Sequence, residues 1–188
     1  DYPLPIYNGD LEAEKGIPEN AVKLARLIAA QHGVFIATPE YNNSVPPLLK
    51  NAIDWVSRNK GGKDGIAFRN KVYGIGSTSD GMVGGARALI DCRKIVQAGL
   101  GAILIPDKIE IGRAQDAFDE AGELIPEPVS KLLKSLCRHL VQLSRHRLEG
   151  DPHHEDRERQ LEHGQDQRHA EQRVLQSHAG EQDVERDQ

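Results

Sequence analysis

The pattern of apolar and polar positions in the first 150 residues predicts strands that alternate with helices. Three short apolar runs have the length and composition of buried parallel strands, and they cover residues 34–38, 71–76 and 102–105. Apolar residues at helical spacing predict helices over residues 18–33, 47–58, 86–98 and 128–148. The alternation predicts the α/β class, with helices packed against a parallel sheet.

The polar loop at residues 39–44 follows the first predicted strand and precedes a helix. It offers the carboxylate of Glu40, the phenol of Tyr41, amides and a hydroxyl. Open parallel sheets bind ligands at the carboxyl ends of their strands, so this loop is a candidate binding site. The alternative is an ordinary polar turn with no ligand.

The residues around this loop resemble a known family. Thr-Pro-Glu-Tyr-Asn at 38–42 and Leu-Lys-Asn-Ala-Ile-Asp-Trp at 49–55 are similar to the signature of NADPH-dependent FMN reductases, which are flavodoxin-like quinone, azo-dye and chromate reductases. The family usually has Gly at the position of Asn43, and Asn tolerates the left-handed backbone that such a turn needs. The resemblance implies that the flavin lies against Pro39, Glu40, Tyr41, Asn42 and Ser44.

A second loop, at residues 76–85, is rich in glycine and hydroxyl groups and follows the second predicted strand. Gly-Gly-Ala-Arg at 84–87 matches the family's Gly-Gly-x-Arg, and the resemblance implies that this loop lines the other side of the flavin. Aligned on those residues, the loop is one residue longer than in the family, with Asp80 in place of Pro. Which of the hydroxyls of Ser77, Thr78 and Ser79 faces the flavin therefore stays open, and a purely structural role of the loop is equally compatible. The candidate cofactor-binding residues of this loop are Ser77, Thr78, Ser79 and Gly81.

No nucleophile–base pair, metal cluster or Gly-Lys-Ser phosphate loop is present in the sequence. The resemblance implies an enzyme that binds FMN, takes a hydride from NADPH or NADH, and reduces a small-molecule acceptor, namely a quinone, an azo compound, chromate or free flavin. It also implies a homodimer or homotetramer, with the helix at 47–58 in the subunit interface. Trp55 is then either an interface anchor or a core residue of one subunit.

The family's phosphate loop, Ser-x-Arg-x-x-Ser-x-Asn, is absent from the sequence. The expected fold is therefore a flavodoxin-like three-layer sandwich that lacks its N-terminal strand and phosphate loop. Two other functions remain open. The chain could be a non-catalytic remnant that associates with full-length relatives, or a flavodoxin-like electron carrier.

Charge and composition separate the chain into a domain at residues 1–150 and a tail at residues 151–188. The domain holds 19 Lys and Arg against 18 Asp and Glu, whereas the tail holds 5 against 11, so the net charge of −5 belongs to the tail. The domain has no excess of basic residues for nucleic acid, and the tail has too few apolar residues to order.

Two further partners are not expected. Three of the five tail histidines, His153, His154 and His163, have no paired spacing with Cys or carboxylate ligands, so no metal site is predicted. No apolar run approaches the roughly 18 residues of a membrane span, and only two cysteines are present, which favours a cytoplasmic protein.

Overall fold

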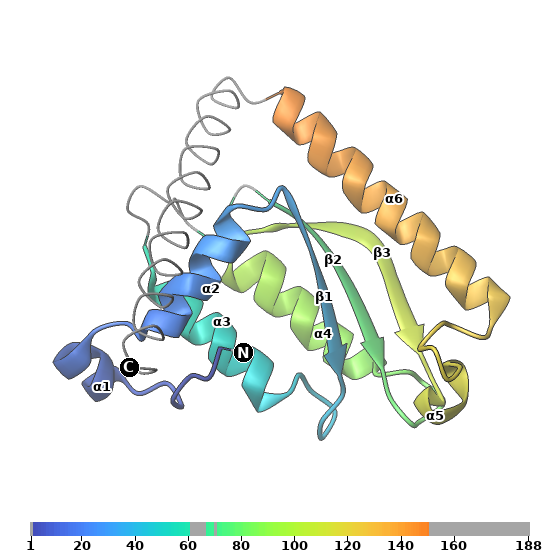
Figure 1. The fold of residues 1–188 in the computed structure, drawn as a ribbon, viewed down its shortest axis with the longest axis horizontal. Helices are drawn as coiled ribbons and strands as arrows, with labels where there is room; N and C mark the ends of the chain where they lie inside the picture. Colours follow the sequence, from blue (N-terminus) through green and yellow to red (C-terminus); the bar gives the residue numbers. More distant parts are fainter. Residues whose placement is uncertain (1, 61–66, 70, 151–188) are drawn as a thin grey trace, which may run out of the picture. The chain divides into compact units, whose positions relative to one another are not determined.

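The computed structural model describes residues 2–60, 67–69 and 71–150, and residues Asp1–His146 form one compact unit. The tail that the sequence predicts to be disordered lies outside the described residues. Within the described part, the three predicted strands form one parallel sheet in the order β1-β2-β3 (Figure 1). They are β1 (Gly33–Pro39), β2 (Val72–Thr78) and β3 (Ile103–Ile111).

Helices cover both faces of this sheet, as the sequence predicts (Figure 1). On one face lie α2 (Glu19–Ala29), α3 (Pro47–Arg58) and α4 (Ala86–Lys94), which continues into the π-helical turn η1 (Ile95–Gly99). On the other face lies α6 (Glu127–Glu149). Neighbouring residues of β3 point to opposite faces: Leu104 belongs to the core under α2, α3 and α4, whereas Ile105 packs with Leu136 of α6.

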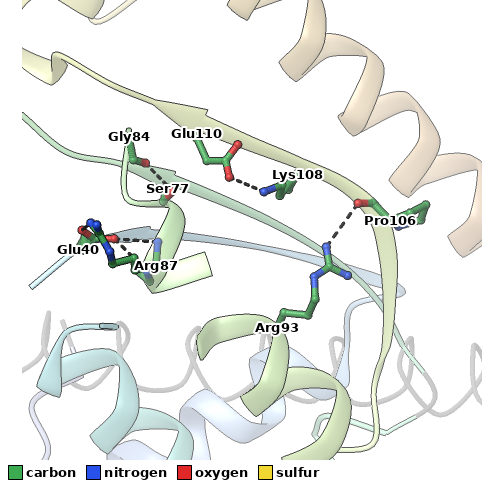
Figure 2. A network of polar contacts seen from close by, with 9 residues as sticks. Glu40, Ser77, Gly84, Arg87, Arg93, Pro106, Lys108 and Glu110 are labelled. Atoms are coloured by element: carbon green, nitrogen blue, oxygen red, sulfur yellow. Dashed lines mark hydrogen bonds and ion pairs between the residues drawn. The ribbon is translucent and has the colours of Figure 1, made fainter. Parts of the chain in front are cut away.

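The third strand is longer than its sequence predicts, because a proline interrupts it without ending it. The parallel register between β2 and β3 shifts after Tyr73 pairs with Leu104, and it resumes where Ile75 pairs with Lys108. Pro106 lies in this irregular segment, where the missing proline N–H costs no ladder bond. The guanidinium of Arg93 on α4 donates to the Pro106 carbonyl over 3.4 Å (Figure 2). The strand therefore continues to Ile111.

A segment before α2 is fastened to α3, and the sequence pattern did not predict it. The carbonyl of Pro5 accepts hydrogen bonds from Trp55 Nε1 at 2.7 Å and from Asn51 Nδ2 at 3.0 Å. Asn51 Oδ1 accepts in turn from the backbone N–H of Tyr7 at 2.8 Å. Trp55 is fully buried and meets the Tyr7 ring edge-on, with centroids 4.9 Å apart. Trp55 is therefore a core residue within one subunit.

Two short helices complete the described chain. The helix α1 (Gly9–Lys15) begins at Asn8, whose side chain caps it by accepting from the backbone of Asp10 at 2.8 Å, and α5 (Ala114–Ala117) follows β3. No helix in the described ranges is long and apolar enough to cross a membrane.

Candidate functional site

The candidate site lies where the parallel strands end together. In Figure 1 the carboxyl ends of β1, β2 and β3 meet at one edge of the sheet, near α5. Both loops predicted from the sequence, at residues 39–44 and 76–85, extend beyond this edge, since β1 ends at Pro39 and β2 ends at Thr78. The edge of an open parallel sheet at which its strands end is the usual position of a ligand site in α/β folds.

The loop after β1 is a tight turn that exposes the Tyr41 ring. The backbone of Tyr41 and Ser44 exchanges two hydrogen bonds, at 2.9 and 3.1 Å. The two residues between them, Asn42 and Asn43, have φ of 49° and 64°, the left-handed values that a two-residue turn with the strand twist requires. The prediction that Asn43 keeps the turn in place of Gly is confirmed. Tyr41 is 57% exposed and can contact a ligand.

The polar side chains at the two ends of this turn face α4. One carboxylate oxygen of Glu40 accepts from the backbone N–H groups of Arg87 and Ala88, at 2.9 and 3.0 Å, in the first turn of α4 (Figure 2). The hydroxyl of Ser44 donates to Asp91 at 2.7 Å. Glu40 and Ser44 are therefore engaged within the protein, whereas Tyr41, Asn42 and Asn43 between them are exposed.

Of the three hydroxyl residues at the end of β2, two are also engaged internally. The buried Ser77 donates to the carbonyl of Gly84 at 2.6 Å, and Thr78 donates to the carbonyl of Ile111 at 2.9 Å. The hydroxyl of Ser79 has no hydrogen bond to any other residue in the described part of the chain. Ser79 is therefore the hydroxyl of this loop that remains available to a ligand.

The tip of this second loop presents an apolar surface beside backbone donors. Met82 is 80% exposed and Val83 is 59% exposed. The N–H groups of residues 80–83 donate to no acceptor within the described ranges. A Cβ on Gly112 would lie 2.4 Å from the Met82 carbonyl, so the loop packs directly on the backbone that follows β3. Apolar side chains beside amide donors suit a flat ligand with acceptor atoms on its edge.

A pocket of about 320 Å³ lies on the α6 face of the sheet. Of the predicted site residues it includes only Ser77 and Thr78, so it is separate from the exposed turn at Tyr41. Its wall is mostly apolar and is formed by Phe35, Ala37, Ile109, Ile111, Phe118, Leu124 and Leu133. In the described residues no group of three or more potential ligand side chains could hold a metal ion.

The way in which the two loops are held together could not be predicted from the sequence. Gly85, the cap of α4, has φ of 81°, and a Cβ there would lie 2.9 Å from Ser77 Cβ and 3.4 Å from Glu40 Cβ. Nothing in the spacing of Asp91 along the sequence pointed to its hydrogen bond with Ser44. The Gly-Gly pair before the helix was the available signal, because a glycine in this position indicates a close backbone approach.

Comparison with known proteins gives the family. Residues 1–116 match the family model described as NADPH-dependent FMN reductase. A quinone reductase of Escherichia coli (strain K12) is 36% identical over 125 residues, which cover 66% of this chain and 64% of that protein. The chain thus spans less than two thirds of that relative's length. An NAD(P)H-dependent FMN reductase of Pseudomonas aeruginosa is 35% identical over 148 residues, covering 78% of this chain and 76% of the relative.

A solved structure with a similar fold supports the same family. The flavoenzyme FerB of Paracoccus denitrificans, an NAD(P)H:(acceptor) oxidoreductase, superposes with a TM-score of 0.60 at 28% identity, covering 77% of this chain and 76% of FerB. The expected flavodoxin-like arrangement of helices on both faces of a parallel sheet is therefore confirmed for the described residues. By sequence match and by fold, this chain belongs to the NADPH-dependent FMN reductase family.

Proposed function

We propose that the chain is an FMN-dependent oxidoreductase that moves a hydride from NADPH or NADH through FMN to a small-molecule acceptor. The observation that carries this proposal is that the loops after β1 and β2, in a chain of this family, both present exposed side chains at the edge where the strands end. A quinone is the favoured acceptor, because relatives of Escherichia coli and Pseudomonas putida are named quinone reductases. Azo compounds, chromate and free flavin are further candidates.

The residues present fit the ring of FMN. The exposed ring of Tyr41 and the apolar tip at Met82 and Val83 provide surface for a flat heterocycle. Ser79 and the unbonded amides of residues 80–83 provide donors for its acceptor atoms. Bound FMN would supply the hydride-carrying ring, while these residues bind it, orient it and polarise its edge.

The roles of the candidate residues divide according to their contacts. Tyr41, Asn42, Ser79 and Gly81 are proposed to contact the flavin directly. Glu40 and Ser44 are proposed to hold the first loop in place, since both bond to α4. The hydroxyls of Ser77 and Thr78 are proposed to shape the second loop, and Pro39 is proposed to lead the chain from β1 into the turn.

The phosphate of FMN has no evident place among the described residues. Glu40 already occupies the amide donors at the start of α4, which would otherwise attract an anion.

We propose that residues 1–150 form the domain and that a further strand pairs with the free edge of β1. In support, β1 pairs only with β2 among the described strands, and its apolar residues are half-buried whereas those of β2 are buried.

We further propose that the chain forms a homodimer or homotetramer and acts in the cytoplasm. For assembly, α3 exposes Leu48 at 79% and α4 exposes Ile90 at 67%, and such side chains gain by burial against a second subunit. For location, Cys92 and Cys137 are both free thiols, as is usual in a reducing compartment.

A flavin titration followed by a turnover assay tests the function. FMN fluorescence should be quenched on addition of the purified chain, and NADPH or NADH oxidation should then depend on both FMN and an added quinone. A folded chain that binds no FMN would refute the proposal. It would favour the alternative of a non-catalytic chain, for which the supporting observation is that the described residues hold no evident phosphate site.

A further inference from the structure

We propose that Glu40 is a positioning residue that ties the turn at residues 41–44 to α4 and so forms the flavin-facing surface before any ligand binds. The proposal rests on the proposed function and deepens it. It assigns Glu40 a role different from the direct flavin contact that the family resemblance implies.

The first observation is that Glu40 caps a helix to which it does not belong. The N-cap of α4 is Gly85, which has no side chain to cap the helix, and the first turn of α4 has no acidic residue. Glu40 supplies the missing acceptor from the loop after β1, bonding the backbone N–H groups of Arg87 and Ala88. Its side chain is only 15% exposed. A carboxylate bonded to helix N-terminal amides in a shielded position is a strong tie.

The second observation is that the backbone at Gly85 allows the loop after β1 to lie close to the start of α4. Gly85 has φ of 81°, and a Cβ on it would crowd Ser77 and contact Glu40. Three segments therefore meet at Gly85: the loop after β1, the end of β2 and the start of α4. This close approach brings the Glu40 carboxylate within reach of the α4 amides.

The third observation is a second tie at the other end of the same turn. Ser44 donates to Asp91, which lies one helical turn after Arg87 on α4. The turn is thus held at residue 40 and at residue 44, with Tyr41 and the two left-handed asparagines between them. Two attachments to one helix restrict the position of the Tyr41 ring, which lowers the ordering cost of binding a flat ligand.

The test compares Glu40→Ala, Glu40→Gln and Ser44→Ala with Glu19→Ala as a matched control. Glu19 is an exposed glutamate whose partner, Lys23, lies on its own helix. Amide hydrogen exchange in the ligand-free protein measures whether Glu40 holds the turn to α4, and FMN titration measures the effect on flavin affinity. Glu40→Ala should speed exchange of the Arg87 and Ala88 amides and of residues 41–44 by about tenfold or more. It should also weaken FMN binding by about tenfold or more.

The other variants keep the test decisive. Glu40→Gln retains an acceptor oxygen without the charge, so it should restore part of the exchange protection even if Glu40→Ala folds poorly. Ser44→Ala should speed exchange in the turn and leave the α4 amides protected, and the control should match the wild type.

Unchanged exchange in Glu40→Ala would overturn the proposal, and weaker FMN binding with that unchanged exchange would show that Glu40 contacts the flavin directly. If the wild-type chain binds no FMN, the proposed function fails, and exchange alone still decides whether Glu40 holds the turn.

Discussion

The attachment of the N-terminal segment to α3 can be tested at one residue, because Asn51 makes both of its side-chain hydrogen bonds to that segment. It accepts from the Tyr7 N–H and donates to the Pro5 carbonyl. Asn51→Ala removes both bonds and leaves the partly buried Tyr7 N–H without its acceptor. The Pro5 carbonyl keeps its bond from Trp55.

The expected loss follows from these contacts. Two neutral hydrogen bonds contribute about 1–3 kcal/mol to the free energy of unfolding. Ala is a better helix former than Asn by up to about 0.7 kcal/mol, and residue 51 lies inside α3, so part of the loss is recovered. We expect Asn51→Ala to lower the free energy of unfolding by about 1–2 kcal/mol.

The assay is urea unfolding followed by the fluorescence of Trp55, the single tryptophan, which lies under the same segment. Ser57→Ala is the matched control on the same helix, because the Ser57 hydroxyl donates only to the nearby Asp54 carbonyl. The control should change the free energy of unfolding by less than about 0.5 kcal/mol. Equal midpoints for the two variants would refute the reasoning and would mean that the segment is not fastened by Asn51.

Three further predictions concern pH, the core and the thiols. The Arg58 guanidinium and a tyrosine hydroxyl both bond to Glu12 and lower the pKa of its carboxyl from the ordinary 4.5. The stability that ionised Glu12 contributes is therefore fully present above the ordinary pKa and is lost as the pH falls through the lower pKa of the folded protein. The urea midpoint of the wild type should thus fall more steeply with decreasing pH than that of Glu12→Gln, and equal falls would contradict this. Leu136 is fully buried between α6 and the sheet, so Leu136→Ala should cost about 2–5 kcal/mol in urea unfolding, and a loss under about 1 kcal/mol would contradict its place in the core. Burial raises the pKa of the Cys92 thiol to about 11, whereas Cys137 is exposed. A thiol reagent at mildly alkaline pH should therefore modify Cys137 quickly and Cys92 only after unfolding, and equal rates in the folded protein would argue against the buried position.

The sequence by itself determined the class of fold and the two loops that form the candidate site. The apolar runs that predict β1 and β2 are short and bounded by polar loops, so local composition was sufficient to locate them. The left-handed backbone at Asn43 was expected from the resemblance, because the family has Gly at this position and Asn is among the few other residues that adopt this conformation. The helix from Glu127 to Glu149 has apolar residues at regular helical spacing, and both of its ends were predicted within one residue.

Only the tertiary structure decided which polar groups are free to meet a ligand. Glu40, Ser44, Ser77 and Thr78 have the right chemistry for a cofactor site, yet each is bonded to a partner on another segment. The hydrogen bonds of Glu40 and Ser44 join residues 47 or 48 positions apart in the chain, and the local pattern of the sequence carries no information about contacts at such a separation. Ser79 and Tyr41 remain available because the packing of β1, β2 and α4 left them so. A sequence shows which groups a chain carries, whereas the fold determines which of those groups are already paired.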